Sequence, residues 1–108
     1  MARPLTLDES TVERALDDLS VYVLPGRTTR PVLAIDEARD AERLGFGGVY
    51  MSERLDLKEA GAVCGAIAAS TSRVRVGPAL VHQGTRHPLT TAAMAATLQS
   101  MTDGRFVL

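Results

Sequence analysis

The chain switches several times between two hydrophobic periods. Short runs rich in valine, leucine and tyrosine predict buried strands at residues 19–24, 47–51, 74–77 and 105–108. Apolar and small residues that recur every three or four positions predict helices at residues 31–45, 57–71 and 88–101. A chain that alternates strand and helix in this way is typical of a parallel sheet whose strands are joined by crossover helices. We therefore predict an α/β fold with four parallel strands and three crossover helices.

Proline and glycine mark the expected ends of these elements. Pro31 and Pro88 suit the first turn of a helix, and Gly45 suits the left-handed residue that follows one. Pro78 cannot donate to a sheet ladder, so it marks a strand end or a β-bulge. A bulge there would re-aim the backbone at the end of the third strand.

Residues 1–18 form either an N-terminal extension or a short helix, and the α/β unit covers residues 19–108. Within residues 8–18 the apolar positions have helical spacing, and Ser10 and Glu13 are placed as a capping box. The helices of the α/β unit should bury three sets of residues: Ile35, Ala38 and Ala41; Ala60, Val63, Cys64, Ile67, Ala68 and Thr71; and Met94, Leu98 and Met101.

The loops that follow the strands carry most of the side chains capable of chemistry. The helix-to-strand turns are short, whereas the strand-to-helix loops are longer and richer in Arg, His, Glu and Thr. Ligands of parallel α/β folds bind at the carboxyl ends of the strands, so these residues fall on the expected face. The loop after the third strand gathers hydrogen-bonding residues at His82, Gln83, Thr85, Arg86 and His87.

Composition removes several classes of function. With 108 residues, 45% of them hydrophobic, the chain is sized for one domain with a packed core. A net charge of -1 and an aromatic content of 4% give no reason to expect nucleic acid or an anionic membrane as partner. No apolar run approaches the ~18 residues of a membrane helix, and the polar start does not resemble a signal peptide. The single cysteine, Cys64, fits a reducing compartment, so we expect a cytoplasmic protein.

Several residues have simple structural explanations. Cys64 lies on a stripe of small residues, which favours packing over nucleophilic chemistry. His87 precedes a helix-starting proline and is expected to order that start, and Arg86 either contacts a ligand or caps its loop. No Cys/His set has metal-ligand spacing and no Gly-x-Gly-x-x-Gly opens a helix, so we expect neither a metal site nor a Rossmann dinucleotide site.

Four segments, in this order and spacing, resemble the luciferase-like monooxygenase superfamily. They are AERLGFGGVYMSER at residues 41–54, AASTSRVRVG at residues 68–77, RHPL at residues 86–89 and GRFVL at residues 104–108. Within the superfamily, the chain is most similar to actinobacterial oxidoreductases that use the deazaflavin coenzyme F420. The resemblance covers about residues 20–108.

The resemblance implies a TIM (β/α)8 barrel of roughly 300 residues, of which residues 19–108 would be the amino-terminal half. It also implies a flavin or deazaflavin ring at the carboxyl ends of the strands, backed by a non-proline cis peptide bond at Ala79-Leu80. Many relatives carry Ser-Asp-His after the second strand, where this chain has Ser52, Glu53 and Arg54. The acid is kept in kind, but a guanidinium stays charged and cannot replace the imidazole as a base.

On this resemblance we expect an F420-dependent oxidoreductase that transfers a hydride between the deazaflavin and a small organic substrate. Glu53 is the expected catalytic acid or base, and His82 the expected substrate contact. The expected coenzyme contacts are Ser52, Arg54, Ala79 and Leu80. From the residues alone, Glu53 and Arg54 are also explained as a solvated, salt-bridged strand end. An FMN-dependent monooxygenase of the same superfamily is the alternative enzyme.

Four parallel strands leave unpaired edges, which a complete fold would cover. We expect either an open sheet or half of a barrel, and the second reading implies a truncation, a split gene or assembly with another half. The chain would then form a homo-oligomer or pair with a complementing second half-barrel. A third hypothesis is therefore a non-catalytic half-barrel that dimerises and acts as a binding or structural subunit.

Overall fold

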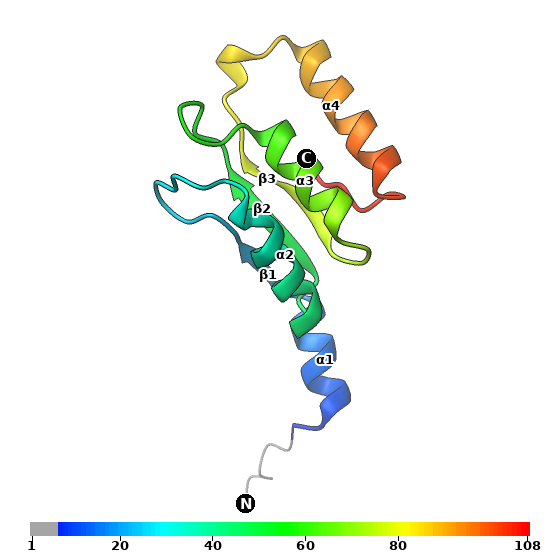
Figure 1. Ribbon diagram of the computed structural model, residues 1–108. Coiled ribbons are helices and arrows are strands. Elements are labelled where there is room, and N and C mark those ends of the chain that lie inside the picture. Colours follow the sequence, from blue (N-terminus) through cyan, green and yellow to red (C-terminus); the bar gives the residue numbers. More distant parts are fainter. Residues whose placement is uncertain (1–6) are drawn as a thin grey trace, which may run out of the picture.

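The structure, a computed structural model, describes residues 7–108 (Figure 1). Its helices are α1 (Glu9–Asp17), α2 (Leu33–Leu44), α3 (Ala60–Ser70) and α4 (Pro88–Met101), with a short 3-10 turn, η1, at Gln83–Thr85. Its strands are β1 (Ser20–Tyr22), β2 (Gly48–Ser52) and β3 (Arg75–Leu80). The first six residues of the predicted N-terminal extension lie outside the described residues. Within residues 7–108, none of the helices has both the length and the apolar character needed to cross a bilayer.

The strands form one parallel sheet in the order β1-β2-β3. Val49 of β2 lies opposite Val21 of β1 and opposite Val76 of β3. Parallel neighbours in chain order require a crossover between each pair, and α2 and α3 provide these crossovers. The predicted parallel α/β class is therefore confirmed.

The predicted fourth strand is reduced to a single parallel bridge between Val76 and Phe106. Two hydrogen bonds of 2.9 Å make this bridge, from the Val76 N–H to the Arg105 carbonyl and from the Val107 N–H to the Val76 carbonyl. Within residues 7–108 the prediction of a full fourth strand is therefore wrong: this segment pairs with β3 in parallel, but only at the one bridge. α4 still carries the chain across to this bridge as the third crossover helix.

The crossover helices lie on one side of the sheet. α2 and α3 cover the sheet, and α4 packs beside α3 (Figure 1). The loops that leave β1, β2 and β3 gather at one end of the molecule, whereas α1 projects from the other end (Figure 1). The strand-to-helix loops, which carry the candidate chemistry, therefore share one edge of the sheet.

The core lies between the sheet and the helices. The predicted inner face of α3 is buried, because its small residues let the helix approach the strands closely. The predicted face of α4 is partly wrong, since Met101 is 53% exposed and Thr91 is buried together with Leu98. α4 packs mainly against α3, so only a narrow stripe of its surface is covered. The buried apolar residues are Val23, Leu24, Ala34, Ala38, Ala41, Val49, Met51, Ala60, Val63, Cys64, Ile67, Ala68, Val74, Val76, Leu98 and Phe106.

α1 begins with a cap that differs from the predicted one. The carboxylate of Asp8 accepts the N–H of Thr11 at 2.8 Å, and the hydroxyl of Ser10 donates to the same carboxylate. Asp8 is therefore the N-cap, since it precedes the first turn while Ser10 already lies within it. The predicted capping box of Ser10 and Glu13 is wrong, although the predicted helix is present.

The carboxyl end of α1 closes the amino-terminal edge of the sheet. The N–H of Gly47 donates to the Leu16 and Leu19 carbonyls at 3.2 and 2.9 Å, and the Arg75 guanidinium donates to the Asp17 carbonyl at 2.9 Å. A Cβ atom at Gly47 would lie 1.8 Å from the Asp17 oxygen, so only glycine fits there. Hydrogen bonds from Gly47 and Arg75 to carbonyls at the end of α1 therefore hold this edge of the sheet.

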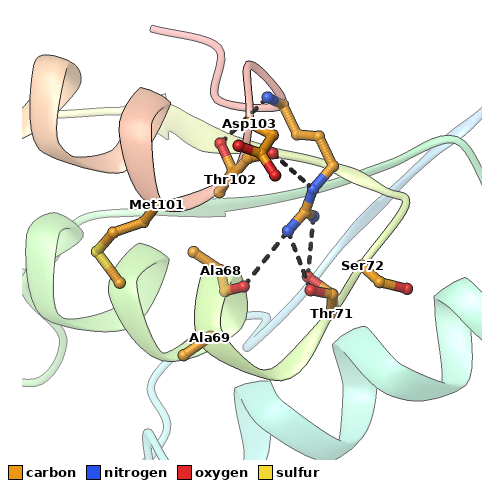
Figure 2. A pocket seen from close by; sticks show the side chains of 8 residues that line it. Ala68, Ala69, Thr71, Ser72, Met101, Thr102 and Asp103 are labelled. Carbon is orange, nitrogen blue, oxygen red and sulfur yellow. Dashed lines mark hydrogen bonds between the residues drawn. The ribbon is translucent and has the colours of Figure 1, made fainter.

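A hollow of about 470 Å³ lies on the same side, between the ends of α3 and α4 (Figure 2). The side chain of Arg105 lines the hollow, and its guanidinium donates to the carbonyls of Ala68, Thr71 and Val74 at 3.4, 3.0 and 2.7 Å. These include carbonyls at the end of α3 that no helical N–H reaches. The hydrogen bonds of Arg105 therefore give this hollow a stabilising role. It lies at the opposite end of the sheet from the strand-to-helix loops.

Candidate functional site

A cavity of about 350 Å³ lies where the three strands end. Tyr22, Ser52 and Leu80, the last residues of β1, β2 and β3, contribute to its lining. The remaining lining residues follow β2 and β3 and are Glu53, Arg54 and His82. Five of the six predicted site residues thus line one cavity. The sixth, Ala79, directly precedes the lining residue Leu80 in the sequence.

The third strand is bulged as it reaches this cavity. Met51 pairs with Pro78 and Ser52 pairs with Leu80, so Ala79 is the extra residue. The predicted bulge beside Pro78 is confirmed. The predicted cis bond at Ala79-Leu80 is wrong, because every peptide bond of residues 7–108 is trans and the extra residue by itself changes the direction of the chain. The bulge leaves Ala79 and Leu80 exposed at the cavity rim.

Glu53 is buried, with 1% of its surface exposed, and both oxygens of its carboxylate accept hydrogen bonds. Oε1 accepts the backbone N–H of His82 at 3.0 Å, and Oε2 accepts the backbone N–H of Ala60 at 2.9 Å and the guanidinium of Arg86 at 2.6 Å. Burial acts to raise the pKa of this carboxyl, but the three donors outweigh it and lower the pKa below the usual value of 4.5. Ionised Glu53 therefore ties the loop after β3 to the start of α3.

Arg86 lies between two carboxylates, those of Glu53 and Glu59. Its side chain is only 10% exposed, and Glu59 also caps the first turn of α3. The buried Nε atom of Arg86 has no hydrogen-bond partner among residues 7–108. Glu53 is thus paired with a residue 33 positions away rather than with the adjacent Arg54, which is exposed. The reading of Glu53 and Arg54 as a solvated ion pair does not describe this strand end.

The two histidines have different surroundings. His82 is exposed, and its carbonyl accepts the Thr85 hydroxyl at 2.8 Å at the start of η1. His87 is the N-cap of α4, since its Nδ1 accepts the Leu89 N–H at 3.1 Å. The prediction that His87 orders the helix start is confirmed. Only the His82 side chain lines the cavity.

Sequence reasoning missed Lys58, which is buried with 2% exposure although it lies in a charged loop. Its Nζ donates to the Leu24 carbonyl at 2.6 Å and lies 5.5 Å from the centroid of the Tyr22 ring. Leu24 has a left-handed φ of 53°, and its N–H donates to the Glu37 carboxylate at 2.8 Å. Two charged side chains therefore hold the backbone just beyond β1. A lysine among alternating apolar and acidic residues carries no mark of burial, so no signal in the chain pointed to it.

Tyr22 was also missed, because it was read only as part of a strand. It is 45% exposed and borders the cavity. Hydrogen bonding to Ser52 lowers the pKa of Tyr22 below its usual value of 10.0, burial opposes this shift, and the positive charge of Lys58 lowers the pKa further. The signal that sequence reasoning could have used is its place at a carboxyl strand end, like that of Ser52.

The described residues offer little for metal binding or for a nucleophilic thiol. No group of three or more His, Cys, Asp or Glu in residues 7–108 is arranged to hold a metal ion. Cys64 packs in the core as predicted, and burial raises the pKa of its thiol to about 12, with the charges of Glu59 and Glu53 acting in the same direction.

Three parallel strands, with crossover helices on one side and a polar cavity at their carboxyl ends, form the arrangement of a β/α barrel segment. The sequence model of the luciferase-like monooxygenases matches residues 20–108. The chain therefore belongs to the luciferase-like monooxygenase family.

Three solved structures share this fold. The coenzyme F420-dependent tetrahydromethanopterin reductase of Methanopyrus kandleri has 29% identity and a TM-score of 0.66, over 82% of this chain and 25% of that chain. Monooxygenase RslO1 of Streptomyces bottropensis has 27% identity and a TM-score of 0.61, over 69% of this chain and 25% of that chain. The oxygenating constituent of 3,6-diketocamphane monooxygenase of Pseudomonas putida, in complex with FMN, has 24% identity and a TM-score of 0.68, over 83% and 27%. The chain spans about a quarter of the length of each of these proteins.

Proposed function

We propose that this chain serves as the amino-terminal half-barrel of an F420-dependent oxidoreductase, which transfers a hydride between the deazaflavin and an organic carbonyl, alcohol or alkene. The observation that carries the proposal is the cavity at the carboxyl ends of three parallel strands in a chain of this family. The relative with 29% identity is F420-dependent, which favours deazaflavin. The FMN complex is 24% identical, so its likeness concerns the fold.

The residues around the cavity suit a flat heterocycle with a polar edge. Leu80, which is 52% exposed, offers apolar surface, while Ser52 and Arg54 add hydrogen-bonding groups. A cavity of about 350 Å³ is near the small end for ligand sites, so it suits the ring rather than the whole coenzyme. We propose that Ser52, Arg54, Ala79 and Leu80 hold the ring.

When bound, the deazaflavin donates or accepts the hydride. The residues of this chain then bind and orient the reacting groups. We assign the exposed His82 to the substrate contact. Glu53 positions His82 through its hydrogen bond to the His82 backbone, and its carboxylate is held by three donors. Its role as a catalytic acid or base stays a prediction.

We propose that the chain associates with a complementing half-barrel or with a second copy of itself. The outer edge of β1 pairs with no strand in residues 7–108. Unpaired strand edges of this kind favour association. A hollow of about 500 Å³ beside that edge is lined mostly by apolar residues of β1 and α2 and their flanking loops, with Glu37 and Asp40 at its margin. The setting we propose is the cytoplasm, which the buried free thiol of Cys64 supports.

Coenzyme binding by the full chain tests the proposal. Because the chain spans only part of the barrel, we expect weak but saturable binding of oxidised F420 in a fluorescence titration, and still weaker binding of FMN. Arg54→Ala should weaken F420 binding by about tenfold, because it removes a charged hydrogen-bond donor. The matched control is Arg43→Ala, since Arg43 is exposed at the far end of α2 and pairs only with Asp40 in the described residues. It should leave binding unchanged.

The other outcomes separate the alternatives. Preferential binding of FMN, with retention of a yellow flavin on purification, would support an FMN-dependent monooxygenase instead. A well-folded dimer that binds neither coenzyme in these titrations would support a non-catalytic half-barrel. Size-exclusion chromatography of the same sample reports the oligomeric state.

A further inference from the structure

We infer that Tyr22 is the proton donor of this site, delivering the proton of its hydroxyl to the substrate oxygen, with the buried charge of Lys58 over its ring. The inference rests on the proposed function. It gives the proton transfer to a residue at the end of β1.

The position of Tyr22 carries the first part of the argument. In the sheet register Tyr22 lies opposite Tyr50, and Ser52 is two residues further along β2. Side chains two residues apart on a strand point to the same face, so Tyr22 and Ser52 share a face of the sheet where both strands end. Both residues line the cavity, and 45% of the surface of Tyr22 is exposed overall. A substrate in the cavity would therefore meet the phenol.

Lys58 carries the second part. It is 2% exposed, and the ion pairs of residues 7–108 do not include it. Its Nζ contacts the Leu24 carbonyl and lies 5.5 Å from the Tyr22 ring centroid. Paired backbone hydrogen bonds with Arg54, of 2.7 and 3.0 Å, hold Lys58 in this place. A buried positive charge beside a phenol stabilises the phenolate that remains after proton transfer.

The other charged and titratable groups at the cavity are less suited to donate a proton. The Glu53 carboxylate accepts three hydrogen bonds, one of them from Arg86, and has a lowered pKa. The guanidinium of Arg54 serves as a hydrogen-bond donor rather than as an acid. His82 lines the cavity from the loop after β3 and remains the substrate contact. Hydrogen bonding to Ser52 and the charge of Lys58 lower the pKa of Tyr22, which makes its phenol a stronger acid than that of a free tyrosine.

The step balances in the direction of carbonyl reduction. The reduced deazaflavin, when bound, would supply the hydride to the carbonyl carbon and would be oxidised by two electrons as the substrate becomes an alcohol. The π electron pair of the carbonyl takes the Tyr22 proton at oxygen. The O–H bond of Tyr22 breaks, its electron pair stays on the phenolate oxygen, and the phenolate regains a proton from water.

Tyrosine ionisation tests the inference without any coenzyme. The chain contains two tyrosines and no tryptophan, so tyrosinate absorbance can be followed without interference. In a pH titration of the full chain we expect one tyrosine to ionise at lower pH than in the chain unfolded by guanidinium chloride. Tyr22→Phe should remove this early transition, and the matched Tyr50→Phe should leave it. Lys58→Met should move it to higher pH, since the stabilising charge is gone.

Each contrary result overturns the inference. It fails if both tyrosines ionise as in the unfolded chain, or if the early transition survives Tyr22→Phe. If Lys58→Met does not fold, Ser52→Ala replaces it, and an unchanged transition in that variant overturns the inference equally.

Assays with F420 distinguish a failure of this inference from a failure of the proposed function. In a chain that turns over reduced F420, Tyr22→Phe should lower kcat by about 10²-fold or more with the F420 dissociation constant unchanged, whereas Tyr50→Phe should alter neither. Unchanged kcat in Tyr22→Phe would overturn the inference alone. A chain that shows the early ionisation but binds no F420 would overturn the proposed function and with it the catalytic use of Tyr22.

Discussion

Glu53 offers the sharpest test of how the candidate site is held together. Its buried carboxylate joins the start of α3, the loop after β3 and the side chain of Arg86. Glu53→Gln keeps the size and shape of the side chain. It removes the charge and replaces one acceptor oxygen with a donor NH2 group. The substitution therefore changes the electrostatics of this edge while preserving its packing.

The hydrogen-bond geometry sets the expected magnitude. The carboxylate accepts three donors, so in the amide at least one of them faces the NH2 group. A buried donor left without an acceptor costs about 1–3 kcal/mol, and removing one member of a buried ion pair costs about 3–5 kcal/mol. Because Arg86 keeps Glu59 as a partner, we expect the free energy of unfolding to fall by about 3 kcal/mol.

Urea unfolding followed by circular dichroism measures this change, with the m-value expected to stay constant. The matched control is Glu42→Gln at the opposite edge of the sheet, where the half-buried carboxylate accepts the N–H groups of Ser72, Arg73 and Val74. It should cost about 1 kcal/mol and leave coenzyme binding unchanged, because no buried guanidinium depends on it. A loss below about 0.5 kcal/mol for Glu53→Gln, or one equal to that of the control, would refute the reasoning.

The pH dependence of the same difference has a defined sign. The pKa of Glu53 is lower in the folded chain than its usual value of 4.5, so the unfolded chain binds the proton more tightly. The stabilisation from Glu53 is therefore complete above that usual value and is lost as the pH falls through the lowered folded pKa. The gap between the natural chain and Glu53→Gln should narrow as the solution is acidified below pH 4.5. A gap that widens on acidification would contradict this assignment.

Three further substitutions or reactions test the surrounding structure. Gly77→Ala would place a Cβ 2.1 Å from the Val107 carbonyl, so we expect a loss of about 1–3 kcal/mol in urea unfolding, and unchanged stability would argue against the bridge at Phe106. His87→Ala removes the acceptor for the Leu89 N–H and should cost about 1 kcal/mol, whereas no loss would deny its role as N-cap. The thiol of Cys64, with a pKa of about 12, should react with Ellman's reagent only as fast as the chain unfolds, and rapid reaction under native conditions would contradict its burial.

Local sequence predicted much of the candidate site. Ser52, Glu53 and Arg54 follow a strand, and His82 follows the next one, so the parallel topology alone places them at one edge. Pro78 predicted the bulge, because proline has no N–H to donate to a sheet ladder. The partner of Glu53 was not predictable, because choosing Arg86 over the adjacent Arg54 depends on how the loop after β3 returns toward α3.

The amino-acid sequence by itself determined the alternation of strands and helices, the family, and the edge that carries the polar loops. The alternation and the polar edge follow from periodicity and from turn residues, which act over a few neighbouring positions. The family follows from the resemblance of four sequence segments. Only the tertiary structure decided that Lys58 is buried beside Tyr22, that Met101 is exposed, and that the last segment makes a single bridge. Those outcomes depend on distances between segments far apart in the chain, and burial and electrostatic pairing are set by such distances.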